Sequence, residues 1–262
     1  MKEFSFDMEA VRKSQLKVLD VVAKFCDEHD IKYFLAFGTL IGAVRHKGYI
    51  PWDDDIDIVM LRPDYDKFRE LFNENNTDYH FECLENSSKT IWMLKGDVVD
   101  NNNSKDGRID VFCMDNVPDD EKLLRKLSIH RKIYRALWGA TVFTVLGPAG
   151  GSPFRKFCVR AFRILARVML IRVFFSPRYF SEKITQEVLQ YSNDKTKRVA
   201  HYSVDSNRIL AINRSAVENV IDGEFEGKLY KIPAGYDEWL RLCYGDYMQL
   251  PPESERVPKH HS

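Results

Sequence analysis

Acidic and β-branched residues alternate at positions 55 to 59, at the end of the run DDDIDIV, residues 53–59. In a β-strand this alternation predicts that Asp55 and Asp57 lie on one face and Ile56 and Ile58 on the other. Two carboxylates side by side repel each other unless a positive charge offsets them. Because carboxylate oxygens are preferred ligands of Mg²⁺ and Mn²⁺, the pair predicts a divalent-cation site.

A third acid stands in the same kind of pattern further along the chain. Asp110 lies between Ile109 and Val111 in the run RIDVF, residues 108–112, which reads as a strand. Its carboxylate is expected to complete the metal site and to accept the proton of an attacking hydroxyl. Asp55, Asp57 and Asp110 are therefore the predicted catalytic and metal-binding residues.

Residues suited to holding a phosphate precede the acids. The apolar run 33–37 ends at Gly38-Thr39, where a glycine lets backbone N–H groups approach a phosphate and a hydroxyl is at hand. A basic turn follows, and its side chains can donate hydrogen bonds to a second phosphate. The predicted nucleotide- and phosphate-binding set is Gly38, Thr39, Arg45, His46 and Lys47. With a metal, this combination predicts phosphoryl transfer by in-line displacement.

Each of these features has an ordinary explanation when taken alone. A Gly-Thr pair is common in turns, a run of aspartates is often a solvated loop, and a single His46 is more often structural. A calcium-binding EF-hand loop starting at Asp53 is excluded, because its sixth position is Ile58 rather than Gly and its twelfth is Asp64 rather than Glu. The functional interpretation rests on the combination with acids embedded in apolar strand patterns.

Four further residues form a second tier of site candidates: Asp53, Asp54, Trp52 and Tyr49. The two acids adjoin the predicted metal pair. Aromatic rings attract a quaternary ammonium group such as that of choline, and Trp92, Tyr244 and Tyr247 are also available for this. Core packing is the ordinary role of such rings, so the alcohol of the donor is not assigned from them.

The run GTLIGAVRHKGYIPWDDDID, residues 38–57, resembles the signature of the LicD family. Residues 108–112, the run IPAGY at 232–236, and YGDYM followed by Pro251-Pro252 resemble later blocks of that family. The resemblance covers most of residues 30–115 and 225–260, whereas residues 118–200 resemble nothing known to us. The family includes bacterial phosphocholine transferases and, more distantly, the fukutin-related proteins.

This resemblance implies an α+β fold: a nucleotidyltransferase-like mixed β-sheet flanked by helices, with a helical insertion. It also implies transfer of a phospho-alcohol group, often phosphocholine, from a CDP-linked donor to a hydroxyl of a cell-surface glycan, with release of CMP. The glycan would belong to lipopolysaccharide, teichoic acid or capsule, and a lipid-linked glycan is one candidate acceptor. Carried onto this chain, Asp55 and Asp57 bind the metal, Asp110 is the third acid, and Gly38 and Thr39 line the nucleotide phosphate.

The same residues are also compatible with other functions. A nucleotidyltransferase that uses an NTP and releases pyrophosphate needs the same acids. A glycosyltransferase could use Asp55-Ile56-Asp57 as a D-x-D metal motif. A non-enzymatic alternative is an inactive, membrane-associated binding module that kept the fold.

Composition bounds the class of protein. The chain has 262 residues, 44% hydrophobic and 30% charged, which is typical of a globular protein with a sizeable core. A formal net charge of zero gives no support to nucleic-acid binding. The five cysteines are odd in number and form no C-x-x-C pair, so neither a disulfide framework nor a zinc ribbon is indicated and we expect reduced thiols.

The N-terminal residues and the apolar runs indicate where in the cell the protein is expected. The first nine residues, MKEFSFDME, contain no apolar signal-peptide core. No stretch reaches the ~18 apolar residues of a membrane-spanning helix. We therefore expect a cytoplasmic protein, in part peripheral on the inner face of the membrane.

The periodicity of apolar residues and the turn residues predict the elements that must position the site. Helices are expected at 7–28 with Asp7 as N-cap, from Pro63 to about residue 74, and at 119–138, 153–171, 179–192 and 236–244. Strands are expected at 33–37, 79–85, 90–94, 108–112, 198–203 and 224–232. The Gly- and Pro-rich run 147–153 marks a boundary, so we expect a catalytic core at 1–146, a helical basic insertion at 147–200, and a C-terminal part at 201–262 that completes the cleft.

The predicted helix at 153–171 has an unusual charge pattern. Lys156, Arg160, Arg163 and Arg167 fall on one stripe, and residues 152–177 contain six basic residues and no acid. The opposite face is apolar. The pattern fits a helix on the surface of an anionic membrane, through 153–175, or a core helix with one solvated face.

Overall fold

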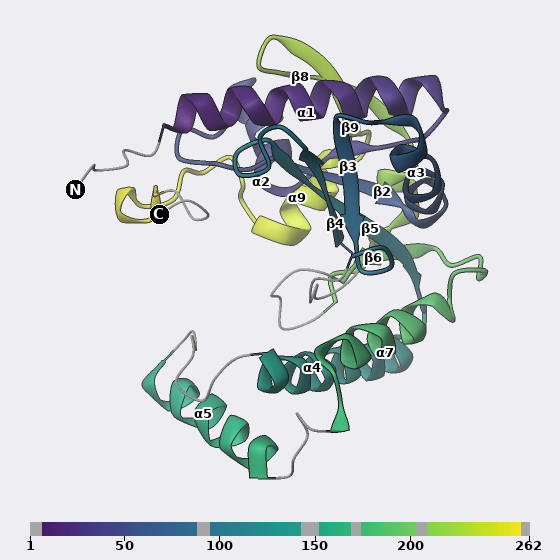
Figure 1. Cartoon of the computed structure of the whole chain (residues 1–262), viewed down its shortest axis with the longest axis vertical. Coiled ribbons are helices and arrows are strands. Elements are labelled where there is room, and N and C mark those ends of the chain that lie inside the picture. Colours follow the sequence, from purple (N-terminus) through teal and green to yellow (C-terminus); the bar gives the residue numbers. More distant parts are fainter. Residues whose placement is uncertain (1–6, 88–94, 143–151, 169–173, 203–208, 258–262) are drawn as a thin grey trace.

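A computed structural model describes residues 7–87, 95–142, 152–168, 174–202 and 209–257 (Figure 1). A mixed β-sheet forms the centre, helices cover one of its faces, and a separate layer of helices lies at one end. The predicted α+β class with a mixed sheet flanked by helices is confirmed.

The central sheet has seven strands, with the order β1-β2-β5-β4-β3 and with β6 and β7 continuing from β5. Strands β2 and β5 are parallel, and the other pairs in this sheet are antiparallel. The strands are β1 (Phe34–Leu35), β2 (Asp57–Leu61), β3 (Tyr79–Cys83), β4 (Lys95–Asp100), β5 (Arg108–Val117), β6 (Arg198–His201) and β7 (Ile212–Asn213).

Helices α1 (Met8–Glu28) and α3 (Arg62–Asn75) pack on one face of this sheet. The predicted N-cap of α1 is confirmed, since the Asp7 side chain accepts a hydrogen bond from the Ala10 N–H at 3.1 Å. Phe25 of α1 meets Phe68 and Phe72 of α3 edge to face. This aromatic contact joins both helices to the core and leaves the opposite face of the sheet for the site.

An internal ion pair ties α3 to the centre of the sheet. The Arg62 guanidinium donates two hydrogen bonds, of 2.7 and 3.0 Å, to the carboxylate oxygens of Asp115 on β5. Both residues are buried. The arrangement fixes the start of α3, which directly follows β2, against the neighbouring parallel strand.

Several expected strands differ from those observed. Only Phe34 and Leu35 of the run 33–37 pair as a strand, because Phe37 already opens helix α2 (Phe37–Ile41). The expected strand 224–232 is instead a hairpin of β8 (Val220–Phe225) and β9 (Lys228–Pro233). Glu226 and Gly227 between them have φ of 51° and 73°, as a two-residue hairpin turn of type I′ requires. The expected strand at 90–94 lies outside the described residues, and β4 begins at Lys95.

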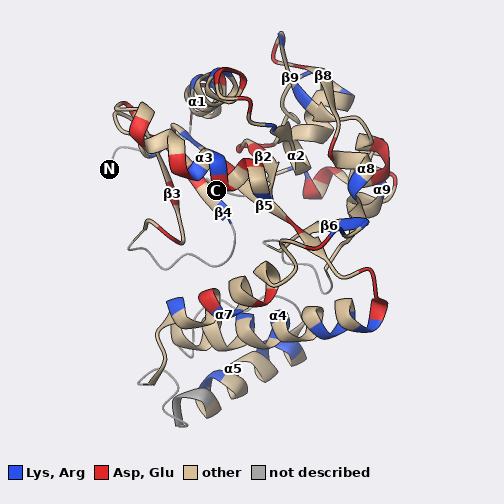
Figure 2. Ribbon diagram, turned by 90° about the vertical axis from the view of Figure 1, so that its right-hand side faces the viewer, with Lys and Arg blue, Asp and Glu red and all other residues tan. Residues whose placement is uncertain are grey.

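The helical layer consists of α4 (Glu121–Val142), α5 (Pro153–Val168) and α7 (Pro177–Leu189) (Figure 2). Helix α4 packs along α7, and α5 lies against α4 at the outer edge. Residues 169–171 of the expected helix lie outside the described residues. In the described ranges, no helix combines the length and hydropathy needed to cross a bilayer. The division into three domains stays a prediction.

Two short helices complete the fold beside the sheet, α8 (Arg214–Val217) and α9 (Tyr236–Tyr244). Helix α9 spans the expected residues. Its Trp239 is buried against Phe34 of β1 and Phe37 of α2, with ring centroids 5.3 and 5.7 Å apart. This contact holds the C-terminal segment next to the start of β2.

Candidate active site

Three aspartates stand in one row across neighbouring strands. Asp57 on β2 pairs in register with Asp110 on β5, and Asp110 pairs in register with Asp97 on β4. Directly opposed residues of adjacent strands project from the same face, so the three carboxylates share the face that α1 and α3 leave uncovered. Asp97 was not predicted as a site residue, because the strand was expected to end at residue 94, whereas β4 runs from Lys95 to Asp100.

Basic side chains balance part of this row. Lys95 forms ion pairs with the carboxylates of Asp110 and Asp97, and Arg108 forms one with Asp97. Lys95 was also missed, because it was placed outside the strand. It lies two residues before Asp97 and therefore on the same face. The Lys95 ammonium thus lies between the carboxylates of Asp97 and Asp110, of which Asp110 was predicted to bind a metal ion.

The pKa values of the row reflect burial and crowding of negative charge. Burial raises the pKa of Asp57 well above its ordinary value, and the carboxylates of Asp55 and Asp110 raise it further. Burial also raises the pKa of Asp110 to about 7, although the Lys95 charge acts in the opposite direction. These acids would lose the proton more readily beside a divalent cation.

The aspartate run forms a second acidic group just before β2. Carboxylate oxygens of Asp53, Asp54 and Asp55 lie within 4.8 Å of one another, so this group could hold a metal ion. Asp54 is fully buried, whereas Asp53 and Asp55 are partly exposed. Since β2 begins only at Asp57, Asp55 precedes the strand rather than alternating along it. The hard oxygen donors and their crowding fit a magnesium or manganese site.

Helix α2 is fitted closely against this acidic turn. A Cβ atom at Gly38 would lie 2.3 Å from Oδ2 of Asp53, so only glycine leaves room for that carboxylate. The hydroxyl oxygen of Thr39 accepts a hydrogen bond from the Asp57 N–H at 2.9 Å, and Thr39 is buried. Thr39 therefore fixes the first residue of β2. Its hydroxyl group can still donate a hydrogen bond to another group.

The basic turn contributes one residue to the site. After α2 the chain makes a π-helical turn, Gly42–His46, which ends at Lys47 with φ of 60°. Arg45 lines the cleft described below and donates a hydrogen bond of 2.5 Å to the Tyr247 carbonyl. His46 and Lys47 do not line that cleft; His46 accepts from Nε of Arg45 at 2.9 Å, and Lys47 is exposed.

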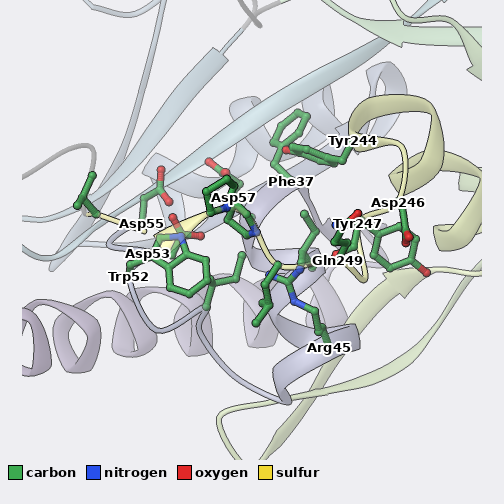
Figure 3. A pocket seen from close by; sticks show the side chains of 17 residues that line it. Phe37, Arg45, Trp52, Asp53, Asp55, Asp57, Tyr244, Asp246, Tyr247 and Gln249 are labelled. Carbon is green, nitrogen blue, oxygen red and sulfur yellow. Dashed lines mark hydrogen bonds between the residues drawn. The ribbon is translucent and has the colours of Figure 1, made fainter. Parts of the chain in front are cut away.

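A cleft of about 580 Å³ opens beside these residues (Figure 3). One wall consists of Gly38, Asp53, Asp55 and Asp57 together with Phe37 and Trp52. The C-terminal segment supplies the facing wall with Tyr244, Asp246, Tyr247, Gln249, Leu250, Pro251, Pro252 and Val257. Residues from distant parts of the chain thus bring carboxylates and aromatic rings around one space.

Of the four second-tier candidates, two line the cleft and two do not. Asp53 and Trp52 line the cleft, and Arg256 lies over the Trp52 ring at 5.6 Å. Asp54 and Tyr49 do not line it; the Tyr49 hydroxyl donates to Gln15 at 3.0 Å, which ties the turn to α1. Asp110 also stands outside the cleft wall, beside Asp57 in the sheet.

Comparison with known proteins gives relatives of two kinds. Over 259 residues, 94% of this chain and 92% of the relative, the chain is 29% identical to the lipopolysaccharide cholinephosphotransferase LicD of Haemophilus influenzae. It is 41% identical over 66 residues to an uncharacterized protein of Rickettsia typhi, a match that covers 23% of this chain and 21% of the other. A further uncharacterized protein, from Rickettsia prowazekii, is 42% identical over 65 residues, covering 21% of this chain and 24% of the other.

A family model agrees with the geometry of the site. The model described as LicD/FKTN/FKRP, nucleotidyltransferase domain, matches residues 30–138, which include α2, the acidic turn and strands β2 to β5. All three acids of the strand row fall within this range. Residues 30–138 therefore match the nucleotidyltransferase domain of the LicD family, and almost the whole chain is similar to a member named LicD.

Proposed function

We propose that this protein transfers phosphocholine from CDP-choline to a hydroxyl group of lipopolysaccharide or a related cell-surface glycan, with release of CMP. The observation that carries the proposal is the cleft, which places the carboxylates of Asp55 and Asp57 opposite aromatic residues of the C-terminal segment. The name of the Haemophilus relative, a lipopolysaccharide cholinephosphotransferase, supports the choice of donor and acceptor.

The composition of the cleft fits both ends of such a donor. Quaternary ammonium groups bind on aromatic faces, and Trp52, Tyr244 and Phe37 line the same space as the acids. Arg45 gives the cleft a cation that can pair with a phosphate oxygen. The N–H groups at Gly38 and Thr39 begin the helix beside the acidic turn and are proposed to face the donor phosphates.

The acids fit a magnesium or manganese ion, and Asp53, Asp55, Asp57 and Asp110 are the residues that would hold it. When bound, such an ion would neutralise negative charge on the phosphate oxygens and on the departing CMP. Thr39, through its bond to the Asp57 N–H, keeps the first strand residue in place. Lys95, which also pairs with Asp97, then holds the Asp110 carboxylate from the neighbouring strand.

The proposed reaction is one displacement at phosphorus. The oxygen of the acceptor hydroxyl forms a bond to the phosphorus that carries choline, and the bond from that phosphorus to the oxygen bridging to CMP breaks. The acceptor proton goes to a carboxylate, for which Asp110 is our choice because it stands beside Asp57 in the sheet. CMP leaves with the bridging oxygen.

Turnover with defined donors tests this function. The protein is incubated with CDP-choline, Mn²⁺ or Mg²⁺ and lipopolysaccharide lacking phosphocholine, and CMP and choline-modified glycan are measured. We expect both products in equal amounts and none with chelator. Pyrophosphate from an NTP would favour the nucleotidyltransferase alternative, and turnover of a UDP-sugar would favour the glycosyltransferase alternative.

The alternative of an inactive binding module predicts a different result. It allows glycan or membrane binding but no divalent-ion binding at the acids. Calorimetric titration of the protein with Mn²⁺ therefore distinguishes the binding-module hypothesis from every enzymatic hypothesis.

The glycan acceptor could also be capsule or teichoic acid instead of lipopolysaccharide. The reaction would then be the same and only the acceptor would differ.

A further inference from the structure

Helix α5 turns its apolar side chains toward solvent. Phe154 is 76% exposed and Phe157 is 68% exposed, and Ile164 and Leu165 are also more than half exposed. Figure 1 shows α5 as the outermost element at the end of the molecule remote from α1. Exposed apolar side chains this close together mark an interaction surface rather than ordinary surface composition.

These side chains lie on one face of the helix. The spacing of a single helical face relates six exposed residues: Phe154, Phe157, Cys158, Ala161, Ile164 and Leu165. The side toward α4 carries Arg163, which is only 6% exposed. A surface helix of a globular protein normally buries its apolar face, whereas α5 exposes this face to solvent.

Basic residues flank the exposed apolar face. Arg155, Lys156 and Arg160 are all exposed, and residues 152–177 contain six basic residues and no acid. In Figure 2 the helix carries blue segments and no red ones. An apolar strip edged by lysine and arginine is the composition of helices that lie in the interface of an anionic bilayer.

The charge pattern selects lipid over a second copy of the chain. Two copies packed face to face through this strip would bring arginine and lysine against the same residues of the partner. An anionic lipid surface instead accepts the apolar strip and pairs with the flanking charges. The helix has 16 residues, about 24 Å, which is enough to lie in the plane of the interface.

We propose that α5 is an in-plane membrane anchor. Phe154, Phe157, Ile164 and Leu165 enter the boundary between headgroups and acyl chains, while Arg155, Lys156 and Arg160 contact anionic headgroups. The exposed Phe174, which follows α5 in sequence, adds to the apolar surface. The anchor does not depend on the proposed reaction, and it would hold the cleft near lipid-linked glycans.

Vesicle flotation of the full chain tests the anchor. Phosphatidylcholine vesicles with and without phosphatidylglycerol are the probe. We expect flotation with the anionic vesicles only, weakened by salt. In the variant F154S/F157S the partition coefficient should fall by about tenfold or more, because two phenylalanines no longer transfer out of water. In R155Q/K156Q/R160Q it should also fall by about tenfold or more at low salt.

Matched variants elsewhere on the surface control for general effects. I221S/L229S replaces two exposed apolar residues on the β8–β9 hairpin, and K13Q/K17Q/K24Q removes three exposed lysines from α1. Both should float like the unaltered protein. No flotation of the unaltered protein at low salt, or equal losses in the control variants, would overturn the proposal.

Cys158 offers a second readout that does not require a change in affinity. It is exposed on the apolar face, so an environment-sensitive fluorophore on it, in a C243S background, should shift to the blue with anionic vesicles. An unshifted spectrum with vesicle-bound protein would contradict insertion of this face. Sedimentation analysis completes the test, since a dimer that dissociates in F154S/F157S would assign the face to self-association instead.

Discussion

Gly38 is the residue at which helix α2 and the acidic turn come closest. Alanine there would bring a Cβ within 2.3 Å of the Asp53 carboxylate oxygen, so that carboxylate must move. The side chain that moves is short and partly exposed, so the fold should persist. We expect G38A to keep its melting temperature and to bind Mn²⁺ about tenfold more weakly, a loss typical of disturbed metal surroundings.

The comparison that checks the cause of this loss uses Asp53 itself. In a D53A background there is no carboxylate to displace, so adding G38A should have no further effect on the Mn²⁺ affinity measured by calorimetry. If G38A alone binds Mn²⁺ as tightly as the unaltered protein, then Asp53 does not belong to the metal site.

His201 is a buried imidazole whose titration should be visible in the stability of the protein. It lies under Phe37 with ring centroids 4.8 Å apart, and neither ring nitrogen has a hydrogen-bond partner in the described part of the chain. Burial and the nearby Arg131 charge lower its pKa to about 4. The folded protein thus binds this proton more weakly than the unfolded chain.

The sign of the pH effect follows from that difference. Below a pH of about 6.5 the unfolded chain binds the proton first, so stability falls as the pH drops toward 4. Between pH 7.5 and 5 we expect His201 to account for a loss of about 2 kcal/mol in the free energy of unfolding. Urea denaturation at the two pH values should show this loss in the unaltered protein and a smaller one in H201F; equal losses would contradict the assignment.

At the scale of secondary-structure elements, the Arg62–Asp115 pair joins α3 to β5. Removing one partner leaves a buried charge without its counterion, so R62A should lower the free energy of unfolding by about 3–5 kcal/mol. The exposed pair of Arg178 and Glu182 on α7 is the matched comparison, and R178A should cost less than about 1 kcal/mol. Equal costs of the two variants in urea denaturation would show that the buried pair does not hold the elements together.

The sequence was sufficient for the elements whose pattern is local. Helix α1 with its Asp7 cap, helix α9 and the first half of β5, predicted at residues 108–112, follow from periodicity and capping residues. The acidic motif was also visible, because its residue types are uncommon in strands. The hairpin at residues 220–233 was missed because Glu-Gly is a weaker turn signal than Asn-Gly.

The site itself depends on information that is not local. Asp97 and Lys95 join Asp57 and Asp110 through the pairing of β4 with β5, and no spacing in the sequence encodes that register. The facing wall of the cleft comes from a segment about two hundred residues after Gly38, held there by Trp239 and by the bond from Arg45. Such contacts follow only from tertiary packing.

At the scale of the whole molecule, charge is divided between the acidic site and the basic helical layer. Lys95 is the internal counterion of the acidic row, so K95M should lower the stability of the metal-free protein by about 1–3 kcal/mol. Mn²⁺ should then raise the melting temperature more in K95M than in the unaltered protein, because the ion replaces a missing positive charge. Replacing the exposed Lys105 by Met is the control.

Thermal unfolding with chelator and with Mn²⁺ measures both effects. A metal-induced shift that is the same in K95M, K105M and the unaltered protein would place the ion away from the Lys95 side chain. The same series also reports whether metal binding and folding are coupled at all.

The central claim is that Asp57 belongs to a divalent-metal site that binds the nucleotide-linked donor. Its most direct test is calorimetric titration of Mn²⁺, followed by CDP-choline, into the unaltered protein and into D57N, with D222N on the exposed hairpin as control. We predict that D57N binds Mn²⁺ at least about tenfold more weakly and loses metal-dependent binding of CDP-choline, whereas D222N behaves like the unaltered protein. If D57N binds both ligands as tightly as the unaltered protein, the assignment of the site is wrong.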